Sequence, residues 1–189
     1  MSAQDSKLFV ISGPSGAGKG TLATRVRERR SNLGLTVSAT TRAPRKGEVD
    51  GVNYFFLTRE EFDRRVANGE FVEWAEVHGN CYGTLVSEVT SKLASGASLI
   101  LEIDVQGALQ VKERFPEAVL IFIKPPSLEV LRERLVGRGT ETPETIELRM
   151  ANAADELALA DRYDDVVVND DLDRATDELV RVLDMHERI

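Results

Sequence analysis

The sequence has few of the residue types that build disulfides and metal clusters. Its 189 residues include one cysteine, two histidines and one tryptophan, and aromatic residues make up 6% of the chain. The single cysteine, Cys81, excludes an internal disulfide, and one thiol cannot build a metal site by itself. His78 and His186 have no partners at metal-ligand spacing, so we assign them no role.

Long apolar runs and an excess of basic residues are also absent. No run approaches the length of a membrane span, and the N-terminal MSAQDSK lacks the apolar core of a signal peptide. The 24 lysines and arginines are outnumbered by 32 acidic residues, which gives a net charge of −8. Nucleic acids and anionic membranes bind broad basic surfaces, so we expect neither as a partner. Without a membrane span or a signal-peptide core, the sequence predicts a soluble cytoplasmic protein. The composition leaves open a local basic pocket for a small polyanion, and a homo-oligomer.

Short apolar runs alternate with helical patterns along most of the chain. Continuous apolar runs of the length of a buried strand occupy residues 7–12, 98–104, 118–123 and 165–169. Helical patterns occupy residues 18–30, 105–114, 128–136, 143–160 and 172–188. Because buried strands that alternate with helices form parallel sheets covered on both faces, the pattern predicts a doubly wound, three-layer α/β fold. The 42% hydrophobic content suffices for one such domain.

Two stretches interrupt this alternation. Between residues 36 and about 84, the segments VNYFFLT and EFVEWAEVHG have the pattern of half-exposed, antiparallel strands. A short helix is predicted between them, because Thr58 and Glu61 form a capping-box pattern. We interpret this region as a small β-rich insertion. The second interruption, VGRGTETP at Val136–Pro143, is polar and broken by glycine, and it predicts a lid.

The segment VISGPSGAGKGT carries the order G-x-x-x-x-G-K of a phosphate-binding loop between a strand and a helix. Its backbone N–H groups and the helix N-terminus form an anion site, and Lys19 supplies charge to the β- and γ-phosphates. The usual pattern has Ser or Thr after the lysine, where a hydroxyl reaches Mg²⁺, but this chain has Gly20. Thr21 cannot simply replace that hydroxyl, because successive helical residues turn by about 100°. Mg²⁺ must then depend more on water and on substrate phosphates.

The strand of LILEIDVQG ends in acidic residues. Glu102 and Asp104 are candidates to orient Mg²⁺-bound water or a substrate group, although solvated acids at a strand end are common. Asp104 and Gly107 also match the D-x-x-G element of GTPases. Guanine-specific GTPases need Asn-Lys-x-Asp as well, and the only similar stretch, Asn169-Asp170-Asp171, lacks the lysine. We reject the GTPase interpretation on that ground.

Arginines gather at two places. Arg42 and Arg45 flank a proline, with Tyr54 downstream, and two guanidinium groups on a rigid turn suit a terminal phosphate. A solvated basic loop is the alternative, and for an arginine pair alone it is the commoner case. Further arginines surround the expected lid. Guanidinium groups on a mobile segment suit phosphoryl transfer, because they can stabilise its charge when the site closes. The alternative interpretation of these arginines is that they form ion pairs on the helix surface. These are Arg134, Arg138 and Arg149.

The segment EFVEWAEVHGNCYGT combines a carboxylate with hydroxyl groups at Glu73, Tyr82 and Thr84. A carboxylate beside a hydroxyl fits the edge of guanine, because the carboxylate accepts from N1–H and the 2-amino group while the hydroxyl donates to O6. Adenine lacks N1–H and a 2-amino group, so it leaves such a carboxylate unpaired. The polar face of a strand is the alternative interpretation of Glu73.

Six blocks of the sequence, taken in order, resemble guanylate kinase. They are GPSGAGKGT, VSATTRAPRKGEVDGVNYFF, EFVEWAEVHGNCYGT, LEIDVQG, RLVGRGTET and VNDDLD. The resemblance extends from Leu8 to about Glu187 and implies a single domain over residues 1–189. It implies a P-loop kinase core with a parallel sheet over about 1–35, 90–125 and 155–189. A β-rich GMP-binding insertion is implied over about 36–89, with a helical lid over about 126–154.

The resemblance also implies Mg²⁺-dependent transfer of the γ-phosphoryl group of ATP to GMP, in purine nucleotide metabolism. The implied ATP-binding residues are Gly13, Pro14, Ser15, Gly16, Ala17, Gly18, Lys19, Gly20, Thr21, Asn169 and Asp170. The implied GMP-binding residues are Ser38, Arg42, Arg45, Tyr54, Glu73, Tyr82, Thr84, Glu102 and Asp104. The implied catalytic residues are Lys19, Arg42, Arg134, Arg138 and Arg149, and Thr21 is the candidate for Mg²⁺, largely through water.

The chain departs from the pattern of the resembled family at three positions. Gly20 stands where many members carry Ser, Glu102 where Asp is usual, and Cys81 where Tyr is common. The Gly-Lys-Gly-Thr ending is familiar from adenylate kinases, so another nucleoside-monophosphate kinase is one alternative, which Glu73 with Thr84 disfavours. A catalytically silent guanylate-kinase-like binding module is the other alternative. Such modules typically lose the phosphate loop, which this chain keeps.

Overall fold

The computed structural model describes residues 6–77, 79–137, 139 and 142–187 and contains two sheets. The larger sheet has five parallel strands in the order β2-β7-β1-β8-β9. Their bounds are β1 Leu8–Ser12, β2 Leu33–Gly34, β7 Ser98–Glu102, β8 Val119–Lys124 and β9 Asp165–Val168. The four strands predicted from apolar runs are confirmed. The sequence did not indicate β2, because two residues form no recognisable run.

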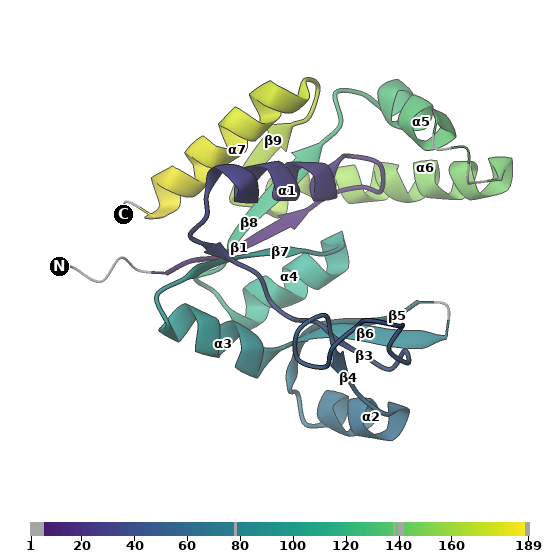
Figure 1. Cartoon of the computed structure of the whole chain (residues 1–189). Helices are drawn as coiled ribbons and strands as arrows, with labels where there is room; N and C mark the ends of the chain where they lie inside the picture. Colours follow the sequence, from purple (N-terminus) through teal and green to yellow (C-terminus); the bar gives the residue numbers. More distant parts are fainter. Residues whose placement is uncertain (1–5, 78, 138, 140–141, 188–189) are drawn as a thin grey trace.

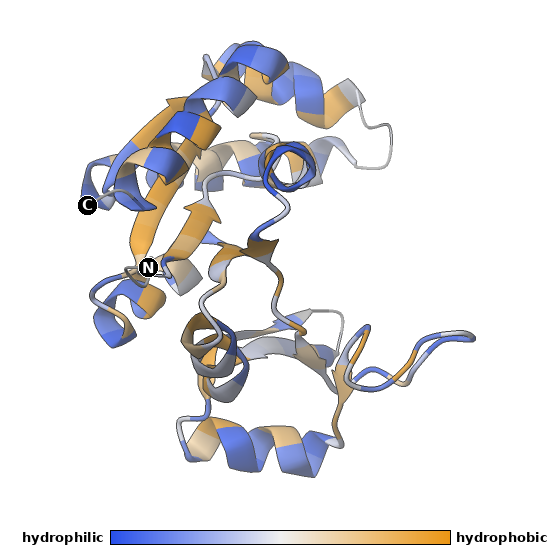
Figure 2. Cartoon of the chain, turned by 60° about the vertical axis from the view of Figure 1, so that its left-hand side comes forward, coloured by the Kyte–Doolittle hydropathy of each residue, from blue (hydrophilic) through white to orange (hydrophobic). Residues whose placement is uncertain are grey.

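Helices cover both faces of this sheet and make the three layers that the sequence predicts (Figure 1). Side chains of a strand alternate between faces, so Phe9 and Ile11 pack on one side of β1 while Leu8 and Val10 pack on the other. The first face is covered by α1 (Lys19–Arg29) and α7 (Leu172–Glu187), and the second by α3 (Val86–Ala94) and α4 (Val105–Arg114). Figure 2 shows the hydrophobic strands between helices whose outer faces are hydrophilic.

The insertion forms a smaller, four-stranded sheet in the order β4-β3-β6-β5. Its elements are β3 Ala39–Thr40, β4 Phe55–Phe56, α2 Arg59–Ala67, β5 Phe71–Val77 and β6 Asn80–Leu85. The side chain of Thr58 accepts from the backbone N–H of Glu61, as the capping pattern predicts. Phe62 of α2 is fully buried and stacks on Phe71 of β5 with 4.3 Å between ring centroids.

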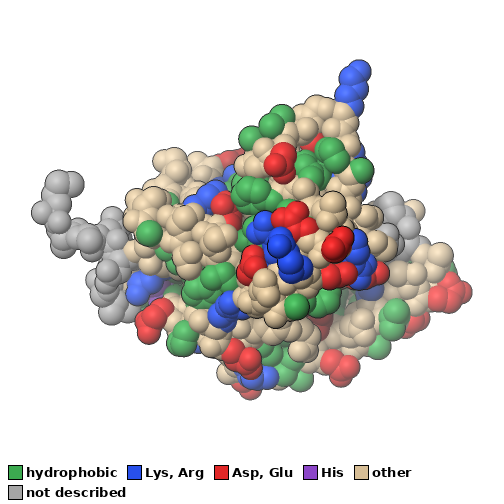
Figure 3. Space-filling model, turned by 90° about the horizontal axis from the view of Figure 1, so that it is seen from below, with side chains coloured by type: hydrophobic (Ala, Val, Ile, Leu, Met, Phe, Trp, Pro, Cys, Tyr) green, Lys and Arg blue, Asp and Glu red, His purple; other side chains and the backbone are tan. Residues whose placement is uncertain are grey.

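The expectation that VNYFFLT and EFVEWAEVHG form antiparallel strands holds for only one of them. Strand β5 pairs antiparallel with β6, whereas β4 keeps only two residues and runs parallel to β3 at the opposite edge. The reason is that β3 and β6 occupy the two positions between β4 and β5. Figure 3 views the molecule from the side of this sheet and α2, where basic and acidic side chains are interspersed.

The segment predicted as a lid contains two helices, α5 (Leu128–Gly137) and α6 (Pro143–Leu157), packed through Leu131, Leu135 and Ile146. Its role as a lid stays a prediction, and we call α5 and α6 the lid helices. Helix α6 ends at Leu157, not at Ala160 as predicted, because a 3-10 turn at Ala160–Arg162 leads the chain into β9. The lid helices and the smaller sheet extend from the same side of the core (Figure 1). No helix within the described ranges is long and apolar enough to cross a membrane.

The backbone at Gly13 generates a first prediction. Gly13 has φ 139°, and a Cβ added there would lie 2.3 Å from the backbone oxygen of Ile123 in β8. Gly13→Ala is expected to lower the free energy of unfolding by more than the about 1–3 kcal/mol of backbone strain alone, as measured by urea unfolding. Gly47→Ala is the matched control, because Gly47 has φ +91 and no atom within 4 Å of its added Cβ. Equal losses in the two variants would contradict the steric argument.

Candidate functional site

The functional loops meet at the carboxyl edge of the larger sheet. Strands β1 and β7 run parallel with Ile11 opposite Glu102, so the phosphate loop after β1 lies beside the acidic end of β7. Asp104 follows β7 and caps α4, where its Oδ1 accepts from the backbone N–H of Gly107 at 2.8 Å. Ligands of open parallel sheets bind at this edge. The fold therefore brings together two motifs that are far apart in the sequence.

The phosphate loop joins β1 to α1 through left-handed glycines at Gly16 and Gly18. No side-chain hydrogen bond caps the start of α1 in the described part of the chain, so its first N–H groups and its dipole face the loop. The ammonium of Lys19 donates to the backbone oxygens of Gly13 at 2.7 Å and Pro14 at 3.1 Å. The loop therefore presents backbone N–H groups and one positive charge at one place, as an anion site requires.

The lid helices α5 and α6 contact the phosphate loop and the segment after β9. Arg134 of α5 donates to the backbone oxygen of Asn169 at 2.8 Å, and the buried amide of Asn169 donates to the oxygen of Ala17 at 2.8 Å. Arg149 of α6 donates to the hydroxyl of Ser15. Arg138, also predicted to act here, lies outside the described residues. A cavity of about 480 Å³, which we call the loop cavity, is lined by Gly16, Gly18, Thr21, Arg134, Asn169 and Asp170.

A second cavity, of about 390 Å³, lies between the core and the β5–β6 hairpin, and we call it the hairpin cavity. Its lining includes Gly20, Ser38, Glu73, Tyr82, Thr84, Glu102 and Asp104. The antiparallel register pairs Glu73 with Thr84, and the Thr84 hydroxyl donates to the Glu73 carboxylate at 2.8 Å. Most of the residues predicted to bind GMP are therefore neighbours here, and their individual roles stay predictions.

The carboxylate of Glu73 is destabilised in its charged form. Burial raises the pKa of Glu73, the hydrogen bond from Thr84 offsets part of this rise, and the nearby charge of Asp104 adds to it. The Glu73 carboxylate, which accepts hydrogen bonds from Thr84, has lone pairs left for a ligand that brings further donors. Acids whose pKa is shifted by burial and by a neighbouring charge in a cleft are candidates for functional residues.

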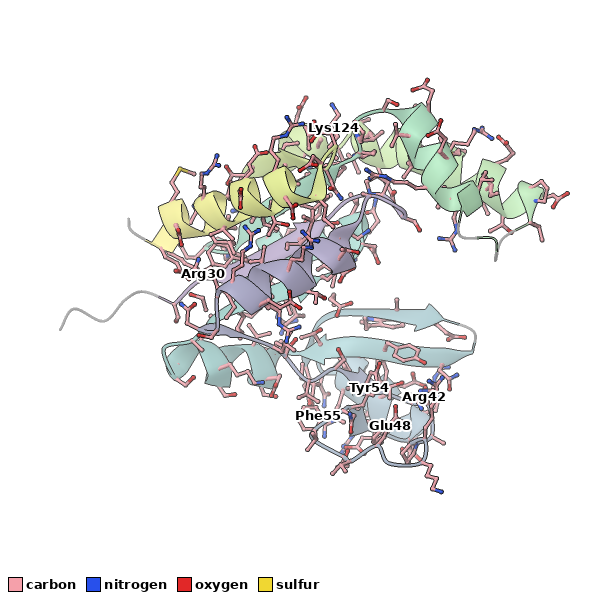
Figure 4. All side chains as sticks on the ribbon, turned by 45° about the horizontal axis from the view of Figure 1, so that its top comes forward. Arg30, Arg42, Glu48, Tyr54, Phe55 and Lys124 are labelled. Atoms are coloured by element: carbon pink, nitrogen blue, oxygen red, sulfur yellow. The ribbon has the colours of Figure 1, made fainter. Side chains whose placement is uncertain are left out.

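The predicted phosphate-binding arginine is held by an acid. Arg42 donates to both carboxylate oxygens of Glu48, at 3.0 and 2.8 Å, and its guanidinium lies 5.3 Å from the ring centroid of Tyr54. Figure 4 shows Arg42, Glu48 and Tyr54 close together at the smaller sheet. The Tyr54 and Tyr82 rings meet edge to face at 6.2 Å. The side chain of Arg45 is exposed, but its backbone N–H donates to Glu48 at 2.6 Å.

Sequence reasoning missed two acids of this region. Glu48 fixes the position of Arg42, and the Arg42 guanidinium holds the pKa of the Glu48 carboxyl below its usual value. The only sequence signal for Glu48 is that an acidic residue follows two arginines closely in an irregular loop. Glu156 of α6 lies within electrostatic reach of Lys19 and Asp104: burial raises the pKa of Glu156, Lys19 lowers it and Asp104 raises it. No motif marks Glu156.

No group of three or more His, Cys, Asp or Glu side chains that could hold a metal ion occurs among the residues that the structure describes. Thr21, the predicted Mg²⁺ contact, is exposed and lines the loop cavity, whereas Gly20 lines the hairpin cavity with Glu102. The two successive positions therefore serve different cavities.

The desolvation of Glu73 predicts a pH-dependent stability. Because the folded-state pKa of Glu73 lies above its ordinary value of 4.5, the stabilisation from this group is present below that value and is lost as pH rises through the folded-state pKa. Glu73→Gln is therefore expected to be more resistant to urea than the native chain at about pH 7, with a smaller gain at about pH 4. Glu117→Gln, an exposed position before β8, is the control and should change little. A Glu73→Gln variant less stable than the native chain at the higher pH would contradict this account.

Comparisons with known proteins agree on one family. The sequence model described as guanylate kinase matches residues 5–186. A guanylate kinase of Gloeobacter violaceus is 57% identical over 178 residues, which cover 94% of this chain and 87% of that protein. One of Halalkalibacterium halodurans is 53% identical over 176 residues, which cover 93% of this chain and 86% of that protein. A crystal structure of guanylate kinase from Anaplasma phagocytophilum matches with a TM-score of 0.71 and 37% identity, over 97% of this chain and 87% of that one. With its sequence matched over nearly its whole length and its fold shared, the chain belongs to the guanylate kinase family.

Proposed function

We propose that this chain transfers the γ-phosphoryl group of ATP to GMP, giving ADP and GDP, as part of purine nucleotide metabolism in the cytoplasm. The observation that carries the proposal is the desolvated Glu73 carboxylate, oriented by Thr84 in a cavity that begins beside the phosphate loop. The relatives named guanylate kinase support the same assignment. Neither nucleic acid nor a membrane is part of the proposal, and a homo-oligomer is compatible with it.

The acceptor base is selected by Glu73. Its carboxylate accepts from N1–H and the 2-amino group of guanine, and these donors offset the burial that disfavours the charged form. The hydroxyl of Thr84 already donates to Glu73, so we assign Thr84 to orient the carboxylate rather than to bind O6. Ser38 lines the same cavity and supplies the hydroxyl for O6. Adenine leaves the carboxylate without either donor, which is a strong penalty.

The phosphate of GMP is held at the smaller sheet. Glu48 binds the Arg42 guanidinium and the Arg45 backbone, which fixes the turn that carries both arginines. Arg42 also lies over the ring of Tyr54, and its hydrogen bond to Glu48, with a smaller contribution from Tyr82, raises the pKa of the guanidinium. Prepositioned guanidinium and phenol groups reduce the entropy that is lost when a phosphate binds.

The phosphoryl donor is held by the phosphate loop and the lid. Lys19 and the backbone N–H groups bind the ATP phosphates, and Asn169 with Asp170 borders the adenine. Arg134 and Arg149, with Arg138, place positive charge around the phosphoryl group as it transfers. Transfer needs no covalent intermediate, because positioning and electrostatic stabilisation supply the catalysis. Closure of the lid excludes water from the reacting atoms.

The residues present fit a Mg²⁺ ion bound with the nucleotide. Mg²⁺ is usually held by substrate phosphates and water with one or two carboxylates, and Glu102 and Asp104 line the hairpin cavity beside the phosphate loop. When bound, the ion neutralises charge on the phosphate oxygens. The chain itself contributes the carboxylates and the positive charge of Lys19.

A nucleotide panel tests the proposed acceptor. Turnover measured by coupled ADP release with ATP and GMP, AMP, CMP or UMP is expected to be fastest with GMP. Glu73→Gln is expected to raise the KM for GMP by about tenfold or more, because an amide cannot accept from both donors, and to leave the KM for ATP unchanged. Faster turnover of AMP than of GMP by the native chain would overturn the assignment. An equal rise of the KM for GMP and of the KM for ATP in Glu73→Gln would overturn it as well.

A Lys19→Ala variant in the same assay separates an enzyme from a silent binding module. We expect the variant to fold and to bind GMP. Its turnover is expected to fall by about 100-fold or more, because the positive charge that stabilises the transferring phosphoryl group is removed. Unchanged turnover would refute the role of the loop in ATP use.

A further inference from the structure

We propose that Arg114, at the end of α4, is a positioning residue that acts through Glu73. Arg114 holds a β-bulge of β5 at Val72, and this bulge turns the Glu73 carboxylate into the hairpin cavity. The proposal rests on the proposed function, in which Glu73 selects the acceptor base. It adds a residue that lines neither the hairpin cavity nor the loop cavity.

The register of the β5–β6 hairpin is interrupted at Val72. Phe71 pairs with Leu85. The next pair joins Glu73 to Thr84, so two steps along β5 match one step along β6, and Val72 is the extra residue of a β-bulge. In a continuous register Val72 would stand opposite Thr84, and Glu73 would point to the other face of the smaller sheet. The pairing of Glu73 with Thr84 therefore depends on the bulge.

The side chains around the bulge show its effect. Phe71 and Trp74 both meet the ring of Phe62, with 4.3 and 6.2 Å between the ring centroids. Residues of a regular strand share a face at every second position, whereas these two residues are three apart. Between them, Val72 packs with the α4 face of the larger sheet and Glu73 lines the hairpin cavity. The bulge therefore gives β5 two successive side chains that face the core.

One side of α4 follows these residues of β5. Gly107, Val111 and Arg114 are four and three positions apart, so they are neighbours on one side of the helix. A Cβ added to Gly107 would lie 3.7 Å from the Cβ of Glu73, which is ordinary van der Waals contact. Val111 packs in the same core cluster as Val72. Helix α4 is therefore the surface against which the bulged part of β5 is placed.

Arg114 fixes the start of β5 by hydrogen bonds to its backbone. The guanidinium donates to the backbone oxygen of Phe71 at 3.0 Å and also to that of Gly69, so it holds the chain directly before the bulge. A planar guanidinium that donates to two oxygens fixes their relative position. A cavity of about 380 Å³ between α4 and β5, lined by Val72, Trp74 and Arg114 among others, leaves room for the strand to shift without these bonds. Arg114 is exposed, so replacing it leaves no hole in the core.

Replacement of Arg114 by methionine tests the proposal in the coupled ADP-release assay. Arg114→Met keeps a long unbranched side chain and removes both hydrogen bonds to β5. It is expected to raise the KM for GMP about fivefold, to narrow the preference for GMP over IMP and to leave the KM for ATP unchanged. Arg181→Met is the matched control, because Arg181 is an exposed arginine of α7, on the opposite face of the larger sheet. The control should change none of these values.

A double-mutant cycle shows whether Arg114 acts through Glu73. In the Glu73→Gln background, Arg114→Met is expected to cause no further rise of the KM for GMP, because the carboxylate that it positions is already absent. The same rise in both backgrounds would overturn the proposal. A KM for GMP that is unchanged in the native background, or a KM for ATP that rises equally, would overturn it too.

Trp74, the single tryptophan of the chain, provides a readout that needs no nucleotide. It directly follows Glu73 in β5, so a change of register moves its ring away from Phe62. The fluorescence emission maximum is expected to shift in Arg114→Met, with the protein still folded by thermal unfolding, and to stay unchanged in Arg181→Met. An unchanged maximum in Arg114→Met would contradict the dependence of the bulge on Arg114. Because this readout is independent of GMP, failure of the proposal is distinguishable from failure of the proposed function.

Discussion

The parallel pairing of β1 between β7 and β8 is the constraint on which the rest of the structure depends. It sets Ile11 opposite Glu102 on one side and Ile121 on the other. Since all three strands end at the same edge, the phosphate loop, the acidic end of β7 and the start of α4 meet there. The alternating side chains of β1 fix the two helical layers at the same time. A shift of register by one residue would exchange core faces and separate Gly20 from Glu102.

In the proposed function, the smaller sheet supplies the residues that recognise the acceptor. Its β5–β6 pairing sets Glu73 beside Thr84, and both side chains line the hairpin cavity. Burying this carboxylate opposes folding, since burial raises its pKa. Binding sites commonly contain groups that lower the stability of the free protein and gain their hydrogen-bond partners when the substrate binds. In the proposed function, donor and acceptor are thus held by different parts of the fold, which meet at the hairpin cavity.

Local signals predicted much of this arrangement. The apolar runs indicated four strands of the larger sheet, and the cap at Thr58 indicated the start of α2. The glycine pattern located the phosphate loop between strand and helix. What the sequence could not predict depends on tertiary pairing. The two-residue strand β2 exists only because a neighbouring strand is present, and the parallel pairing of β4 with β3 depends on the order of the sheet. The closeness of Gly20 to Glu102 likewise follows from sheet register.

Recognition of the acceptor depends, in the function proposed here, on one desolvated carboxylate that binds two donors of guanine. Equilibrium binding of GMP and of IMP, measured by calorimetry without ATP, tests this most directly, because IMP keeps N1–H and O6 and lacks only the 2-amino group. We predict that IMP binds about tenfold more weakly than GMP, and that this difference disappears in Glu73→Gln. Equal affinities of the native chain for GMP and IMP would contradict the assignment of Glu73.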